Sequence, residues 1–180
     1  TSRRPRRRRS RPSGSGSGAL PAVWTVPFAH HPHFTGRKRE LGELRRALDA
    51  KPAAITQPLV IHGLGGVGKT QLSQAVAERV ATLFRDGVWF VPLAAVDDPE
   101  LVAPAIASVL DLGGSGTVAP AARLIAQLRR KETLLVLDNV EQVTACAPLL
   151  VTLLQACPGL RILVTSTEPL RHLPLAGCTG

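Results

Sequence analysis

The sequence predicts a three-layer α/β fold, in which a mainly parallel sheet is flanked by helices on both faces. Segments that are apolar throughout alternate with segments whose apolar residues recur at helical spacing, which is typical of such a sheet. The apolar segments are residues 58–62, 88–93, 133–137 and 161–165. A glycine-rich turn joins the first of them directly to a helical segment, which makes a strand–turn–helix unit.

Most of the positive charge lies outside the part that we expect to fold. The chain has 180 residues and a formal net charge of +9. Residues 1–18 hold seven arginines and no acid, and subtracting these seven charges from +9 leaves +2 for residues 19–180. We expect this Arg/Ser/Gly-rich arm to be disordered, because it has no apolar side chain to bury. Two interpretations of the arm stay open: it binds nucleic acid, or it is a solvated linker.

An extended lead-in is expected over residues 19–36, because Pro21, Pro27 and Pro32 interrupt any helix there. The length that remains is enough for one domain of about 150 residues with its own core. We expect residues 37–180 to form this domain and to be incomplete on its C-terminal side.

The first half of the domain predicts a helix, a strand and a second helix. Leu41, Leu44 and Leu48 recur at helical spacing within residues 37–50, with charged residues between them. The first strand follows at 58–62. After the glycine turn, apolar side chains again recur at helical spacing. They are Leu72, Val76, Val80 and Leu83.

The second half of the domain continues the alternation. The strand at 88–93 is followed by Asp97, Asp98 and Pro99, which signal the start of a helix over 100–112. The remaining elements are a helix at 119–130, a strand at 133–137, a mainly helical region at 140–157 and a strand at 161–165. Pro148 is expected to start or kink the second part of the helical region.

Residues 63–70, GLGGVGKT, match the phosphate-loop pattern G-x-x-x-x-G-K-[ST] in full. Glycines let successive backbone N–H groups point inward as an anion nest, and the dipole of the following helix adds positive potential. We expect Lys69 to reach the β- and γ-phosphates of a nucleoside triphosphate and the Thr70 hydroxyl to bind Mg²⁺. The predicted fold is therefore that of a P-loop NTPase. The glycines expected to bind phosphate are Gly63, Gly65, Gly66 and Gly68.

An acidic residue follows the buried strand 133–137. Asp138 would lie at the carboxyl edge of the sheet, where ligands of open α/β sheets bind and where a second Mg²⁺ ligand is needed. The alternative is an aspartate that caps the next helix, which is a common role. Its occurrence together with the phosphate loop favours the metal site.

With these motifs assembled, the chain resembles the nucleotide-binding domain of the STAND class of P-loop ATPases, the NB-ARC-like group of bacterial regulators, apoptotic adaptors and plant disease-resistance proteins. The resemblance covers roughly residues 24–172. The motifs that carry it, in order, are FTGRKRE at 34–40, GLGGVGKT at 63–70, GVWFVPL at 87–93, LLVLDNVEQV at 134–143 and RILVTSTEPL at 161–170.

The resemblance implies positions for several residues. The 161–165 strand would lie between the phosphate-loop strand and the Asp138 strand. Phe34, Gly36 and Arg37 would lie on the adenine side of the nucleotide, and Ser166 would sense the γ-phosphate. Such proteins act as switches that bind ADP in one state and ATP in the other, with effector and sensor domains on either side.

Departures from the family pattern affect hydrolysis and the extent of the domain. Asn139 stands where many relatives have a second acid, and Glu141 is a displaced substitute. We therefore expect slow or partner-dependent ATP hydrolysis. Thr167 replaces an arginine that pairs with the γ-phosphate in many relatives. Nothing after residue 172 resembles the family's closing helical and winged-helix segments.

The primary hypothesis is a cytoplasmic regulatory switch that binds ATP or ADP with Mg²⁺ and acts through protein partners or self-association. One alternative is a turnover ATPase or kinase with Lys69, Asp138 and Glu141 as its catalytic residues. Another is a nucleic-acid-binding module that acts through residues 1–18. A metal site at His30, His31 and His33 is disfavoured, since no acid or cysteine accompanies them.

Overall fold

The computed structural model describes residues 23, 25–27, 37–50, 57–112, 118–168 and 177–179. In this described part, five strands form one sheet in the order β2-β3-β4-β1-β5, and every neighbouring pair is parallel. The strands are β1 (Leu59–His62), β2 (Val88–Pro92), β3 (Thr133–Asp138), β4 (Leu160–Ser166) and β5 (Gly177–Thr179). The predicted parallel sheet is confirmed, and so is the position of the 161–165 strand between its two expected neighbours.

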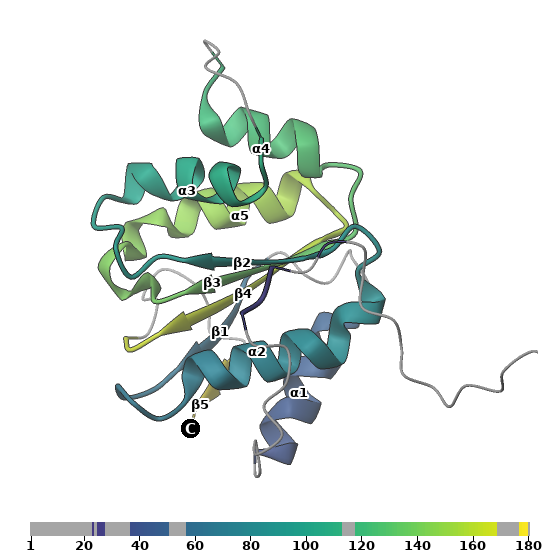
Figure 1. Cartoon of the computed structure of the whole chain (residues 1–180), viewed down its shortest axis with the longest axis vertical. Coiled ribbons are helices and arrows are strands. Elements are labelled where there is room, and N and C mark those ends of the chain that lie inside the picture. The colour runs from purple at the N-terminus through teal and green to yellow at the C-terminus, as the bar shows by residue number, and fades with distance from the viewer. Residues whose placement is uncertain are drawn as a thin grey trace, which may run out of the picture.

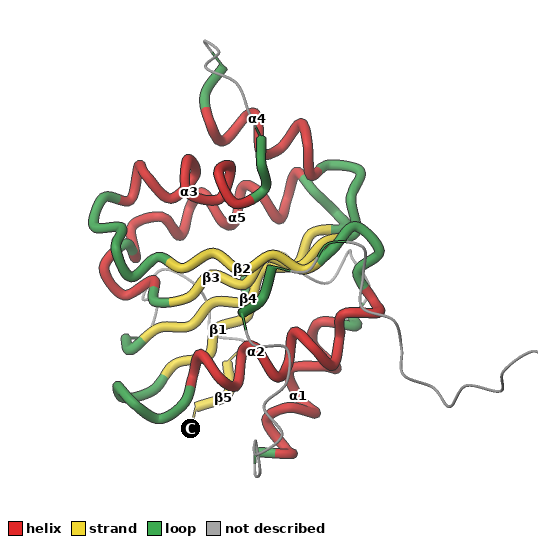
Figure 2. The backbone as a smooth tube through the Cα atoms, in the orientation of Figure 1, coloured by secondary structure: helices red, strands yellow, loops and turns green. Residues whose placement is uncertain are grey.

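Helices cover both faces of the sheet, as Figures 1 and 2 show. One face carries α1 (Lys38–Leu48) and α2 (Lys69–Val80), whose buried side chains form one apolar cluster with the sheet. The opposite face carries α3 (Val102–Val109), α4 (Pro120–Leu128) and α5 (Ala147–Ala156), which contribute to a second cluster. The three-layer α/β class is therefore confirmed. Burial of these two clusters supplies the main driving force for folding.

The predicted helix at 100–112 is shorter and less regular than expected. It begins with a 3-10 turn, η3 (Pro99–Leu101), in which the Asp98 carboxylate accepts the backbone N–H of Glu100 at 2.8 Å. The α-helical part ends at Val109, and Asp111 has a left-handed conformation with φ of 51°. The predicted cap, Asp98, is therefore at the expected position, but the turn that it caps is a 3-10 turn that precedes the α-helix.

The predicted helical region at 140–157 begins with two 3-10 turns, η4 (Val140–Gln142) and η5 (Thr144–Cys146). The α-helix starts only at Ala147, with Pro148 in its first turn. Proline is tolerated there because its missing N–H would have no partner within the helix. One further short 3-10 turn, η2 (Ala81–Leu83), extends the end of α2.

The last strand, β5, was not expected from the sequence. It has three residues and pairs with β1 through Val60, Ile61 and His62. A segment this short, which includes a glycine, lacks the apolar run that marked the other strands.

Cys146 and Cys157 are free, buried thiols, and burial raises the pKa of Cys146 to about 11. In the described residues, no helix has the length and apolar character that crossing a membrane requires. The expectations for the arm at 1–18, for Phe34 and Gly36, and for the three histidines at 30, 31 and 33 fall outside the described residues.

Candidate functional site

The glycine loop lies between the end of β1 and the start of α2. Gly66 and Gly68 have φ of 77° and 84°, left-handed conformations that favour glycine. Gly68 is the N-cap residue of α2, and no side chain caps this helix end. A Cβ placed on Gly65 would meet no atom within 4 Å, so the loop leaves open space there. The backbone N–H groups at this helix end can therefore bind an anion.

Lys69 is largely buried, with 8% of its surface exposed, at the first position of α2. Its Nζ donates to the carbonyl oxygens of Gly63 at 2.9 Å and Leu64 at 3.0 Å. These bonds hold the ammonium group against the loop. Among the described residues, no carboxylate forms an ion pair with it, so its positive charge is not neutralised locally.

Asp138, at the end of β3, lies beside Thr70 of α2. The Thr70 hydroxyl is 3.0 and 3.1 Å from the two carboxylate oxygens of Asp138, which is 6% exposed. The hydroxyl of Thr165 on β4 donates to the same carboxylate at 2.5 Å and accepts the N–H of Asn139 at 3.0 Å. This network fixes the orientation of the carboxylate and leaves hard oxygen ligands together at the carboxyl edge, a donor type that Mg²⁺ prefers.

Sequence reasoning missed Thr165, although a signal existed. In the parallel register Leu137 lies beside Val164, so Asp138 and Thr165 are the next pair along the two strands. A hydroxyl beside a buried carboxylate is a natural hydrogen-bond donor to it. The pairing of Thr165 with Asp138 follows only when β3 and β4 are known to be neighbours. The family resemblance already implied that they are.

Glu141 lies on the turn that follows Asp138. Asn139 has a left-handed conformation, with φ of 63° and ψ of 60°, which asparagine tolerates better than most residues. Its Nδ2 donates to Glu141 Oε1 at 3.1 Å, and the N–H of Thr167 donates to Glu141 Oε2 at 3.4 Å. Both oxygens of Glu141 therefore already accept hydrogen bonds, which constrains the side chain.

Ser166 and Arg37 contact the loop from two sides. The carbonyl oxygen of Ser166 accepts the N–H of Gly63 at 3.3 Å, while its hydroxyl accepts the N–H of Glu168 at 3.2 Å. Arg37 Nη2 donates to the carbonyl oxygen of Val67 at 2.8 Å and so links the start of α1 to the loop. The structure thus brings the described candidate residues together at one edge of the sheet. Gly36 lies outside the described residues.

Comparisons with known proteins agree with this architecture. The NB-ARC domain model matches residues 37–169. An uncharacterized protein of Mycobacterium tuberculosis is 34% identical over 153 residues, which cover 83% of this chain and 38% of that protein. A putative HTH-type transcriptional regulator of the same species is 42% identical over 129 residues, covering 69% of this chain and 14% of the regulator. The regulatory protein AfsR of Streptomyces griseus is 32% identical over 154 residues, 81% of this chain and 15% of its own length.

This chain therefore spans less than two fifths of the length of each of these relatives. Among solved structures, Cdc6p of Pyrobaculum aerophilum superimposes with a TM-score of 0.54 at 15% identity, covering 85% of this chain and 42% of Cdc6p. That likeness concerns the fold alone. Because the family match spans most of the chain and includes the glycine loop and Asp138, the chain belongs to the NB-ARC family of P-loop NTPase domains.

Proposed function

We propose that this domain binds ATP or ADP together with Mg²⁺ and works as a nucleotide-dependent switch within a larger regulatory protein. The observation that carries the proposal is the convergence, at one edge of the sheet, of an uncapped helix end, an unneutralised lysine and a hydroxyl–carboxylate pair. The names of two relatives, a putative transcriptional regulator and the regulatory protein AfsR, support a regulatory role. In this proposal residues 37–180 form the nucleotide-binding domain, after an arm at 1–18 and a lead-in at 19–36.

The loop and Lys69 bind the phosphates in this proposal. The N–H groups of Gly63, Gly65, Gly66 and Gly68 and the end of α2 provide hydrogen bonds, while Lys69 provides the charge. Within the described residues, Lys69 donates to the neutral carbonyl oxygens of Gly63 and Leu64, so exchanging them for phosphate oxygens replaces weak partners with charged ones. Arg37 and Gly36 are assigned to the adenine side, and Ser166 to the γ-phosphate.

Thr70 and Asp138 are the proposed Mg²⁺ ligands. Bound Mg²⁺ would neutralise phosphate charge and orient the β- and γ-phosphates. Thr165 keeps the carboxylate of Asp138 turned toward Thr70 through its 2.5 Å hydrogen bond. The residues therefore fit a magnesium ion by ligand type, since hydroxyl and carboxylate oxygens are hard donors.

Hydrolysis is proposed to be slow or partner-dependent. Asn139 cannot act as a base, and both oxygens of Glu141 accept hydrogen bonds from Asn139 and Thr167. A group held in this way is poorly placed to orient a water molecule. The competing hypothesis is a turnover ATPase or kinase that uses Glu141, which lies on the turn that follows Asp138. Phosphate release from the isolated chain at several turnovers per minute or faster would support that enzyme instead.

The direct test is the affinity of Lys69→Ala for ATP and ADP, measured by isothermal titration calorimetry. We expect a loss of at least ten-fold, because charge-assisted hydrogen bonds contribute about 1.5–3 kcal/mol each. The control is Lys131→Ala, which removes an equal charge from the turn before β3, at the other edge of the sheet. It should bind ATP and ADP as the parent does. Equal affinity in all three proteins would contradict the assignment of the site.

A further inference from the structure

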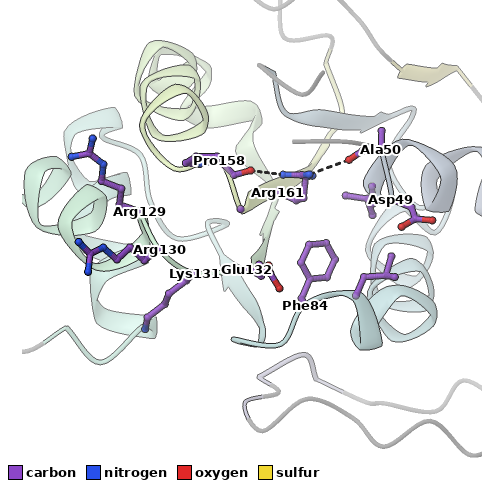
Figure 3. A pocket seen from close by; sticks show the side chains of 12 residues that line it. Asp49, Ala50, Phe84, Arg129, Arg130, Lys131, Glu132, Pro158 and Arg161 are labelled. Carbon is purple, nitrogen blue, oxygen red and sulfur yellow. Dashed lines mark hydrogen bonds between the residues drawn. The ribbon is translucent and has the colours of Figure 1, made fainter. Parts of the chain in front are cut away.

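A second cavity lies at the amino edge of the sheet, opposite the glycine loop. Its volume is about 540 Å³, and it is formed by the end of α1, the turn after α2, the turn before β3 and the start of β4 (Figure 3). Because β3 and β4 are parallel and begin here, the cavity is separated from Asp138 by the full length of the strands. Neither the proposed nucleotide site nor the Mg²⁺ ligands contribute to it.

A buried cation without a counter-charge lines this cavity. Arg161 is 6% exposed, and its guanidinium donates to the carbonyl oxygens of Pro158 at 3.0 Å, Leu160 at 2.9 Å and Ala50 at 3.1 Å. Figure 3 shows it held between Pro158 and Ala50. Its Nε is itself buried and, within the described residues, has no acceptor, and no carboxylate there forms an ion pair with the guanidinium. Burial lowers the pKa of Arg161, which reflects the cost of desolvating an unpaired charge.

The walls around Arg161 are held firmly in place. A Cβ on Gly159 would collide with the carbonyl oxygen of Lys131, so the turns before β3 and β4 approach more closely than any other residue permits. The Asp86 carboxylate accepts the N–H of Glu132 at 2.9 Å, and this hydrogen bond also holds the turn before β3 in place. The cavity is therefore preformed, and little binding free energy would be lost in ordering its walls around a ligand.

Further positive charge surrounds the mouth of the cavity. Arg129, Arg130 and Lys131 line it and, in the described part of the chain, their side chains make no ion pair or hydrogen bond. Figure 3 shows them extending away from Arg161, so they form an outer rim. Arg129 and Arg130 also line an adjoining hollow, which extends this basic rim toward α5. An anionic ligand would meet charge at the rim first and the buried guanidinium second.

The lining also has apolar and acidic parts that restrict the class of ligand. Leu83, which is 37% exposed, and Phe84 form an apolar wall, while Asp49 and Glu132 add negative charge on the α1 and β3 sides. A nucleic-acid strand carries a phosphate at every step and offers no apolar side chain to that wall. A peptide can offer one carboxylate to the guanidinium and an apolar side chain to the wall.

We propose that this cavity is a docking site for an acidic peptide segment of a partner protein, with a glutamate or aspartate side chain pairing with Arg161 and a neighbouring apolar side chain against Leu83 and Phe84. The planar guanidinium matches a carboxylate, and the pair neutralises a charge that is otherwise buried alone. The site is separate from the proposed nucleotide site, so either assignment can fail without the other.

The test is an NMR titration of the ¹⁵N-labelled full chain with the peptide acetyl-Leu-Glu-Leu-Glu-Leu-amide, using acetyl-Leu-Gln-Leu-Gln-Leu-amide as the matched control. A residue-specific signal is needed, because the seven arginines of residues 1–18 also attract acidic peptides. We expect saturable shifts at the Nε–H of Arg161 and at the backbone amides of 129–132. The glutamine peptide should bind there at least ten-fold more weakly. Equal shifts from both peptides, or none at Arg161, would overturn the proposal.

Two double variants that remove the same amount of charge test whether the basic rim contributes to peptide binding. Arg129→Gln with Arg130→Gln should weaken the glutamate peptide about five- to ten-fold at the Arg161 signal, whereas Lys38→Gln with Arg39→Gln, at the start of α1, should change it less than two-fold. These positions are exposed, so the variants should fold as the parent does. Equal weakening by both pairs would mean attraction by overall charge alone and would overturn the site. So would displacement of the peptide from Arg161 by a 20-base-pair DNA duplex, which would assign the surface to nucleic acid.

Discussion

The two edges of the parallel sheet hold their buried charges in different ways. At the carboxyl edge, Asp138 lies between the hydroxyls of Thr70 and Thr165, and Lys69 is held over an open glycine loop. At the amino edge, Arg161 is enclosed by backbone carbonyl groups and closely packed turns. The carboxyl edge thus combines donors with open space, and the amino edge combines a single fixed cation with a rigid wall. Under the two proposals above, one sheet presents two anion-binding chemistries, one suited to phosphates and one to a carboxylate.

The largest expected effect at the carboxyl edge is on metal dependence. Asp138→Asn keeps the side-chain shape but removes the charge that attracts Mg²⁺. We expect Mg²⁺ to raise the affinity of the parent for ATP by about 10- to 100-fold, and that of the variant by less than about three-fold. Calorimetry with Mg²⁺ and with EDTA measures both values. Asp97→Asn, an exposed aspartate, is the control, and an unchanged response to Mg²⁺ in Asp138→Asn would remove Asp138 from the metal site.

Alanine substitutions at one glycine on each edge compare how closely the two edges are packed, through the free energy of unfolding. Gly159→Ala should lower the free energy of unfolding by about 1–3 kcal/mol, because the added Cβ must push the Lys131 backbone away. Gly65→Ala should change it by less than about 0.5 kcal/mol, since a Cβ there meets nothing within 4 Å. Urea denaturation followed by circular dichroism gives both values. If the two variants were equally stable, the close packing inferred at the amino edge would be wrong.

Thr165 is expected to have a smaller effect on Mg²⁺-dependent binding at the carboxyl edge. Thr165→Val removes the hydroxyl that donates to Asp138 and accepts from Asn139, so the carboxylate loses its fixed orientation. We expect the Mg²⁺-dependent affinity for ATP to fall about three- to ten-fold, with partial recovery in Thr165→Ser. Binding in EDTA should change little. A loss of the same size with and without Mg²⁺ would indicate a general structural effect instead.

The smallest predicted effect concerns acid stability at the amino edge. The N–H of Glu132 and the nearby Arg85 lower the pKa of Asp86 below its ordinary value near 3.8. The folded state thus binds this proton less readily than the unfolded state, so the stabilisation is present above the ordinary pKa and is lost as the pH falls through the lowered one. Asp86→Asn should be less stable than the parent at neutral pH, and the gap should narrow as the pH falls below 3.8. A gap that widens in acid would contradict this account.

The sequence predicted the fold where apolar patterns were continuous and failed where contacts were long-range. The four predicted strands are confirmed because each contains a run of apolar residues, whereas β5 has only three residues and depends on pairing with β1. Candidate residues followed from motifs, but Thr165 needed the register of β3 against β4. Arg161 gave no signal, because its burial as a cation depends on the carbonyl oxygen of Ala50, which is 111 residues away in the sequence, as well as on that of nearby Pro158.

Whether this domain binds adenine nucleotide is tested by identifying the nucleotide that the purified chain retains. The parent and Lys69→Ala are each incubated with Mg²⁺ and ATP, passed through a desalting column and denatured, and the released nucleotide is identified by chromatography. We expect about one ATP or ADP per parent chain and a strongly reduced amount in the variant. Equal amounts from both proteins, or no adenine nucleotide from the parent, would contradict the proposal.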